Sequence, residues 1–213
     1  MRLKRSSQQG DTIIEVLFAV AVFAMVAVGS LSIMNQGTAT AQRSLEITLV
    51  RQQIDAQAEA IRYIHQSYVT VFQKEGGTLA GTAAEWVKMT SKATGKGANS
   101  ASVFGDVTAD GACPTSVPGE RPFILNARTA TVWNGLPTMS APADASLPPF
   151  AQVIYTSDTV IGQAYGIWVE AVPSSAASAG AGFVDFHIRA CWEGPGSSAP
   201  MTLGTIVRLY EPR

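Results

Sequence analysis

Residues 10–34 read GDTIIEVLFAVAVFAMVAVGSLSIM, and this stretch decides how the chain is organised. From Val16 to Met34 the sequence is apolar except for one glycine and two serines, and its length approaches the ~20 residues that a helix needs to cross a hydrocarbon core. Glu15 stands at the start of this apolar run. A carboxylate inside a bilayer costs roughly 2.5–3.5 kcal/mol at the centre of a helix, and such residues usually have a function. Glu15 is therefore the first candidate functional residue.

The residues before the apolar run predict the direction of insertion. Arg2, Lys4 and Arg5 lie in the first ten residues, and the positive-inside rule keeps such a segment in the cytoplasm. We therefore expect a single-pass protein of the cytoplasmic (inner) membrane, with its N-terminus in the cytoplasm and the rest of the chain on the far side.

Two ordinary interpretations account for the apolar run by itself. A secretory signal peptide would be cut after the A-x-A-like site Ala39-Thr40-Ala41. That leader would have 41 residues with an apolar core of 19, against roughly 15–30 and 7–15 residues in ordinary signal peptides. A plain signal anchor fits the length of the run, but it leaves Gly10 and Glu15 without a role.

A third interpretation rests on the order of residues around Gly10. The stretch Gly10-Asp11-Thr12-Ile13-Ile14-Glu15-Val16-Leu17 follows a basic leader and resembles the class III signal of type IV pilins and pseudopilins. The resemblance implies that a prepilin peptidase cuts between Gly10 and Asp11, so that Glu15 becomes the fifth residue of the mature chain. It also implies methylation of the new N-terminus. Family members usually begin with Phe or Met after the cut, whereas this chain begins with Asp11.

The same resemblance implies how the protein is used. Subunits of this family are first inserted in the lipid bilayer. A membrane assembly platform then builds them into a filament, in which their apolar helices pack together. A buried carboxylate is tolerated only beside a cation. In the family this cation is the α-amino group of the neighbouring subunit, so Glu15 would pair with Asp11 of the next copy. The expected partners are the prepilin peptidase, other pilin subunits and the assembly platform.

The implied function is that of a structural subunit of a type IV pilus or a type II secretion-like filament, as a minor pilin or pseudopilin that serves adhesion, motility, DNA uptake or secretion. The filament would be extracellular or periplasmic. The alternative is a membrane-anchored or secreted binding domain that never polymerises. Without its leader the chain has 12 basic and 16 acidic side chains, and this net charge of −4 does not indicate nucleic-acid binding.

The rest of the chain predicts a long helix followed by a β-rich domain. No proline occurs before residue 114, which permits one helix from near Asp11 to Phe72, with Gly37 as its weakest point. Apolar residues recur on its outer part at spacings of three and four, namely Val50, Ile54, Ala58, Ile61, His65, Tyr68 and Phe72. The expected layout is a leader in 1–10, a membrane or filament-core helix in 11–34, an amphipathic helix in 35–75 and a globular head in 76–213.

The head predicts one short helix and several strands. The stretch Phe183 to Trp192 alternates between apolar and polar residues, as an amphipathic strand does. Strands joined by short turns predict an antiparallel sheet, and the amphipathic helix is expected to cover one of its faces. The fold class is therefore α+β and pilin-like. The helix is expected at Thr82–Ala93, and the strands at Phe123–Leu125, Thr129–Trp133, Gln152–Thr156, Ala164–Val172, Gly182–Glu193 and Thr202–Tyr210.

The two cysteines predict a covalent link inside the head. Cys113 and Cys191 form an even pair in an exported domain, which favours a disulfide. The alternative is two separate buried thiols.

Catalytic and metal-binding motifs do not stand out in the sequence. It contains no G-x-S-x-G elbow, no complete phosphate-binding loop and no C-x-x-C pair. His65 lies on the apolar stripe of the helix, and His187 lies opposite Phe186 and Ile188 on its strand, where we expect it to be solvated. We therefore expect no enzyme, no cofactor and no metal.

Overall fold

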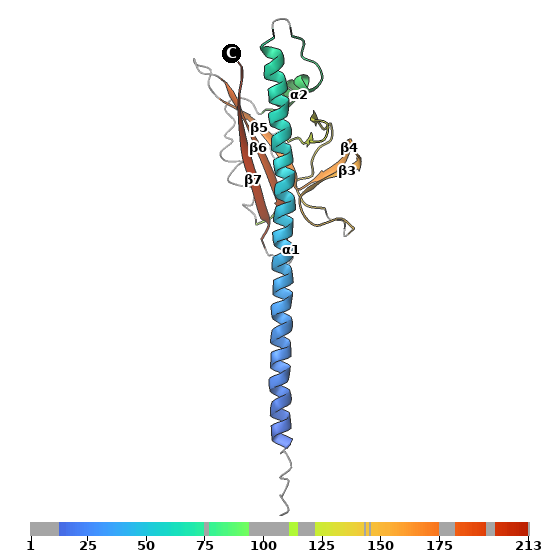
Figure 1. Ribbon diagram of the computed structural model, residues 1–213, viewed down its shortest axis with the longest axis vertical. Coiled ribbons are helices and arrows are strands. Elements are labelled where there is room, and N and C mark those ends of the chain that lie inside the picture. The colour runs from blue at the N-terminus through green and yellow to red at the C-terminus, as the bar shows by residue number, and fades with distance from the viewer. Residues whose placement is uncertain are drawn as a thin grey trace, which may run out of the picture. The chain divides into compact units, whose positions relative to one another are not determined.

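The computed structural model shows an α+β protein whose chain clusters into two units, residues 1–42 and residues 43–213 (Figure 1). The structure describes residues 13–74, 77–93, 111–114, 122–142, 144, 146–174, 182–194 and 199–212.

The N-terminal helix α1 is continuous over 60 residues, from Ile13 to Phe72. It passes through Gly37, the position where the sequence predicts the weakest helix. Two hydroxyl groups beside Gly37 return to the helix backbone: Thr38 Oγ1 donates to the Asn35 carbonyl and Thr40 Oγ1 to the Gln36 carbonyl. The single long helix that the sequence predicts is therefore confirmed from Ile13 onward.

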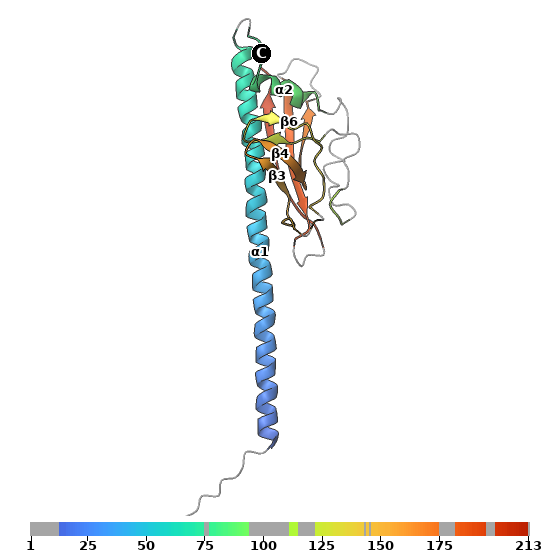
Figure 2. The same ribbon diagram turned by 90° about the vertical axis from the view of Figure 1, so that its right-hand side faces the viewer.

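The outer part of α1, residues 43–72, lies along one face of a three-stranded sheet (Figure 2). The apolar stripe predicted for this helix is buried from Val50 to Ile61. The prediction is wrong for the last residue of the stripe, because Phe72 is 49% exposed. At Phe72 the helix has reached the end of the sheet that covers its apolar stripe. The buried side chains of α1 are Glu46, Val50, Ile54, Gln57, Ala58, Ala60, Ile61 and Ile64.

The sheet is antiparallel with the order β5-β6-β7. The alternation predicted for the middle strand is confirmed, because Val184, Phe186 and Ile188 are buried on the face that packs against α1. A second, small apolar cluster of Met139, Trp168 and Cys191 lies on the other face. The strands are β5 (Ile167–Pro173), β6 (Phe183–Trp192) and β7 (Met201–Tyr210).

The stretch Ala164–Val172 is extended as predicted, but it is not one strand, because the chain turns at Gly166. This residue has a φ of 62°, and a Cβ there would lie 2.5 Å from the Cys191 carbonyl oxygen, so only glycine fits. The turn separates β4 from β5, and β4 pairs with β3 in a hairpin of its own instead of joining the sheet. The hairpin strands are β3 (Gln152–Ser157) and β4 (Val160–Tyr165).

Three short elements complete the head. Helix α2 runs from Thr82 to Thr90, three residues shorter than predicted, and Gly81 is its N-cap. Strands β1 (Leu125–Asn126) and β2 (Thr131–Val132) form a hairpin of two residues on each side.

Candidate assembly site

The residues that the sequence assigns to processing lie at the very start of the chain. Gly10 and Asp11 lie outside the described residues. Glu15 lies in the first turn of α1 and is exposed. A negative charge there interacts favourably with the partial positive charge of the helix N-terminus.

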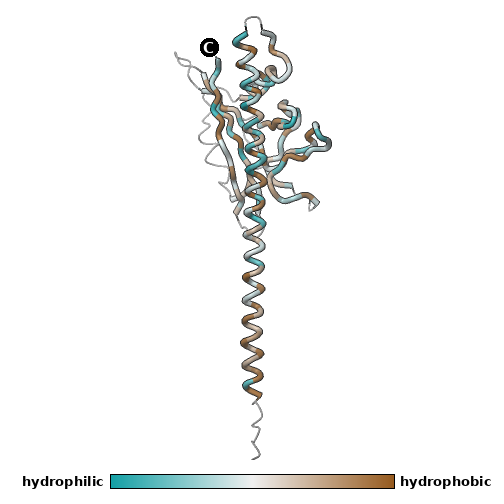
Figure 3. Tube along the Cα trace, viewed as in Figure 1, coloured by the Kyte–Doolittle hydropathy of each residue, from teal (hydrophilic) through white to brown (hydrophobic). Residues whose placement is uncertain are grey.

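The first part of α1 is hydrophobic along most of its length (Figure 3), and its large apolar side chains from Ile13 to Met34 are exposed. Ile13, Phe18, Phe23 and Met25 are each more than 70% exposed, and no residue is buried within the most apolar window of the helix. Burying one such side chain stabilises by about 1.5–3 kcal/mol, so covering the whole segment is worth tens of kcal/mol. By length and composition this helix is able to cross a membrane.

The predicted disulfide is present between Cys113 and Cys191, with the two Cα atoms 5.6 Å apart. The alternative of two separate thiols is therefore wrong. Cys191 is fully buried on β6, where it packs with Trp168 and Met139. The bridge thus ties the segment around Cys113 to the face of the sheet that α1 does not cover.

The same face of the sheet contains a buried ion pair that sequence reasoning missed. Glu170 on β5 and Arg189 on β6 are 4% and 5% exposed, and Arg189 Nη2 lies 3.9 Å from Glu170 Oε2. The indole N–H of Trp168 donates to Glu170 Oε1. Polar residues at alternate positions of an amphipathic strand ordinarily indicate a solvent face, so the sequence offered no signal of burial.

His187 also departs from its prediction. It is half-buried rather than solvated, beside Glu170, Asp185 and Arg189 on the same face. Burial lowers the pKa of His187 below its usual value, and the nearby Arg189 guanidinium acts in the same direction.

The β1–β2 hairpin is held in place by side chains of both helices. Gln57 makes two hydrogen bonds to the backbone of Leu125, and Glu85 Oε2 accepts from the Val132 N–H over 2.8 Å. Lys88 donates to the other Glu85 oxygen over 2.6 Å, which balances the buried charge. The last residue of the turn, Ala130, has a φ of 51°. This left-handed conformation is costly for alanine, so the surrounding contacts must impose it.

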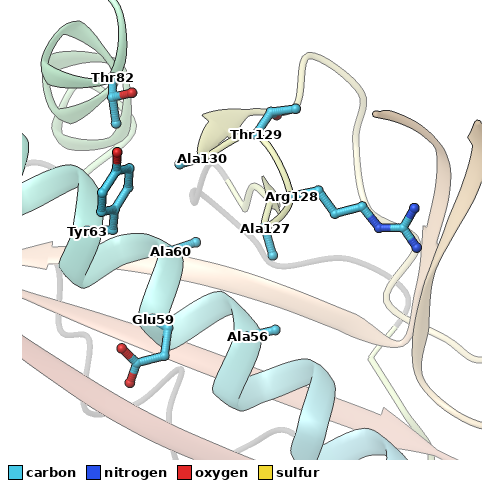
Figure 4. A pocket seen from close by; sticks show the side chains of 9 residues that line it. All are labelled: Ala56, Glu59, Ala60, Tyr63, Thr82, Ala127, Arg128, Thr129 and Ala130. Atoms are coloured by element: carbon cyan, nitrogen blue, oxygen red, sulfur yellow. The ribbon is translucent and has the colours of Figure 1, made fainter. Parts of the chain in front are cut away.

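A pocket of about 510 Å³ opens between this hairpin, α1 and the start of α2 (Figure 4). Tyr63 stands at its edge with its hydroxyl group toward Thr82, whereas Glu59 and Arg128 point away from it. Four of its nine lining residues are alanines, and the other five carry polar groups. These alanines are Ala56, Ala60, Ala127 and Ala130.

The β3–β4 hairpin is fixed to the β1–β2 hairpin at its tip. Asn126 Nδ2 donates to the Thr159 carbonyl over 2.7 Å, and Arg128 Nη1 donates to the Asp158 carbonyl over 3.0 Å. The Arg128 guanidinium also lies 4.1 Å from the centre of the Tyr155 ring, a cation–π contact. Burial raises the pKa of Tyr155 above its usual value. The two hairpins therefore form one unit.

Within the described residues, no group of three or more His, Cys, Asp or Glu side chains is arranged to hold a metal ion. The chain matches no family model, no curated protein and no solved structure.

Proposed function

We propose that this chain is a subunit of a type IV pilus or a type II secretion-like filament, cleaved after Gly10 and assembled through its N-terminal helix. The observation that carries the proposal is the order of residues from Gly10 to Leu17 at the head of an apolar helix. The exposed apolar surface of residues 13–34 supports it, because this surface needs either a bilayer or other copies of the helix to cover it.

Glu15 has a specific part in this proposal. When apolar helices pack against one another they exclude water, and an isolated carboxylate among them is strongly unfavourable. A cation from the neighbouring copy removes that penalty, and cleavage after Gly10 creates one in the α-amino group of Asp11. Processing and assembly are then coupled, because an uncut chain lacks the partner for Glu15 of its neighbour.

The direction of insertion follows from the leader. Arg2, Lys4 and Arg5 hold the N-terminus in the cytoplasm, and the head faces the opposite side of the membrane. The Cys113–Cys191 disulfide supports this orientation, because disulfides persist in oxidising compartments outside the cytoplasm.

The first test is the N-terminus of the protein taken from its native cell envelope, measured by intact mass and N-terminal peptide mapping. A chain that begins at Asp11 is expected. Replacing Gly10 with leucine should block the cut, whereas Ser7→Leu, a matched change inside the leader, should leave it intact. A chain that begins at Met1, or at Gln42, would contradict the proposal and favour an anchored or secreted binding domain.

The second test separates processing from assembly. Glu15→Ala should give a chain that is cut but stays in the membrane, so that filaments sheared from the cells lack it. Glu59→Ala removes an exposed carboxylate from the outer part of the same helix and should assemble normally. Normal assembly of Glu15→Ala would show that the carboxylate has no part in the filament.

A further inference from the structure

We infer that Glu46 is a positioning residue that, together with Gln57, holds α1 in one direction on the head. The value of a fixed direction for assembly rests on the proposed function. A filament subunit would touch its neighbours through the N-terminal helix and also through the head. Both sets of contacts form in every copy only if the head keeps one orientation on its helix.

Glu46 and Gln57 are the buried polar residues of α1 within the described part of the chain. Glu46 is 7% exposed and Gln57 is 1% exposed, whereas the other buried residues of this helix are apolar. The two residues are 11 positions apart in the sequence. Because a helix turns once every 3.6 residues, this spacing is about three turns. Both side chains therefore leave the helix on the same side, about 16 Å apart along its axis.

Each of the two polar side chains reaches a different part of the head. Glu46 Oε2 accepts a hydrogen bond of 3.1 Å from the indole N–H of Trp192, the last residue of β6. Gln57 bonds to the backbone of Leu125, the first residue of β1. Hydrogen bonds are directional, whereas apolar contacts are not and allow a helix to roll or tilt. Two such fixed points on one side of α1 therefore define its direction.

Glu46 lies at the point where α1 enters the head. Of the residues of α1 from Ile13 to Leu45, all of which the structure describes, none is buried, so Glu46 makes the first buried contact of the helix. Its carboxylate lies close to Gly194, where an added Cβ would be 3.5 Å from Glu46 Oε2. Without the bond to Trp192, the first buried contact of α1 would be that of Val50, about one turn later.

A carboxylate is an unfavourable side chain at this buried position if stability alone is considered. Replacing a buried charged group by an apolar side chain of similar volume is often neutral or stabilising. Buried polar residues that are kept despite this cost are best known for selecting one arrangement among several, as in the register of coiled coils. Glu46 therefore contributes direction rather than stability.

The test of the fixed direction is a distance measurement between two spin labels in the full chain, purified in detergent. One label is attached to Leu45→Cys and the other to Ile206→Cys on β7, because these positions are 59% and 54% exposed. The chain with native Glu46 should give one narrow distribution of distances. Glu46→Leu should broaden the distribution. Glu46→Gln should keep it narrow, because the amide oxygen of glutamine also accepts from the Trp192 N–H.

The matched control moves the first label from Leu45 to Asp55, an exposed position beside Gln57 on the same helix. The distribution between Asp55→Cys and Ile206→Cys should stay narrow in all three chains, because Gln57 still holds this part of α1. Broadening of both distances by Glu46→Leu would show a general loosening of the head and would overturn the inference. So would a narrow Leu45 distance in Glu46→Leu, or a broad one in Glu46→Gln.

Stability and filament yield separate positioning from a purely structural role. The free energy of unfolding of Glu46→Leu should equal or exceed that of the native chain. Cells that carry Glu46→Leu should nevertheless lose filaments from the sheared fraction, and Glu46→Gln should restore the native yield. A yield that falls only in step with stability would overturn the positioning role.

The two measurements also keep the inference apart from the proposed function. A native chain that gives no filaments would contradict the function, and the spin-label distances would still decide whether Glu46 fixes the direction of α1. Filaments at native yield from Glu46→Leu, in a chain whose Leu45 distance is broadened, would overturn the link between this direction and assembly.

Discussion

The side-chain amide of Gln57 makes two hydrogen bonds to a single residue 68 positions away: its Nε2 donates to the Leu125 carbonyl over 2.7 Å and its Oε1 accepts from the Leu125 N–H over 2.9 Å. Gln57 is 1% exposed and Leu125 is fully buried. The Gln57 amide thus satisfies the backbone N–H and C=O of Leu125, as a neighbouring strand would in a sheet. These two bonds anchor to α1 a hairpin that has only two residues in each strand.

Gln57→Leu should destabilise the head by about 2–4 kcal/mol, because both backbone groups of Leu125 would be buried without a partner. The free energy of unfolding of the full chain in detergent, followed by denaturant titration, measures this. Gln52→Leu, at an exposed position five residues earlier, should change stability by less than about 0.5 kcal/mol. Equal effects of the two variants would show that the Leu125 contacts contribute nothing.

Cys113→Ser combined with Cys191→Ser should destabilise the head by about 2–5 kcal/mol. The bridge joins residues 78 positions apart, so it strongly restricts the unfolded chain, and Cys191 packs in the small cluster with Trp168. Unfolding of the native chain with and without reductant should give the same difference. Reductant should have no further effect on the double variant, and an effect there would point to a cause other than the bridge.

The sequence predicts the elements in which the pattern of apolar residues is regular. The long helix follows from the absence of proline and from the stripe at Val50, Ile54, Ala58 and Ile61, and β6 follows from its alternation. Both are confirmed because a single buried face repeats over many residues. The break at Gly166 is not visible in the pattern, since apolar residues continue on both sides of it and only the φ of 62° reveals the turn.

Contacts between distant segments account for the rest. Glu170 and Arg189 occupy positions of their strands that ordinarily face solvent, and only the packing around Trp168 shows that they are buried. In the sequence, Arg128 likewise resembles an ordinary turn residue, although in the structure it joins the β1–β2 and β3–β4 hairpins. For Gly10 and Glu15, by contrast, the sequence is the stronger source, because their roles depend on a peptidase and on other copies of the chain.

Ala130→Gly should stabilise the head by roughly 0.5–1 kcal/mol. Alanine in the left-handed region costs about 1–2 kcal/mol, and the greater flexibility of glycine in the unfolded chain offsets part of that gain. The matched variant is Ala127→Gly in the same turn, where no positive φ is relieved, and it should destabilise. Thermal unfolding of the two variants side by side measures the difference. A loss of stability with Ala130→Gly would mean that the buried methyl group outweighs the strain.

The stability of the head should depend on pH through His187. Burial lowers the pKa of His187 in the folded chain below the 6.5 of an unperturbed histidine, so the unfolded chain binds the proton more tightly. The contribution of His187 is therefore complete above about pH 6.5 and is lost as the pH falls toward the folded-state pKa. Four charged groups lie near the ring: the carboxylates of Glu170 and Asp185 act to raise the pKa of His187, and the guanidinium groups of Arg189 and Arg208 act to lower it.

His187→Gln should abolish this part of the pH dependence. The measurement is the free energy of unfolding of the native chain and of His187→Gln between about pH 5.5 and 7.5, a range that brackets the unperturbed value. The native chain should lose stability relative to the variant as the pH decreases, and the difference between them should be constant above about pH 7. A difference that does not change with pH would show that His187 titrates alike in the folded and unfolded chain. An opposite slope would mean that Asp185 and Glu170 outweigh burial and hold the ring in its charged form.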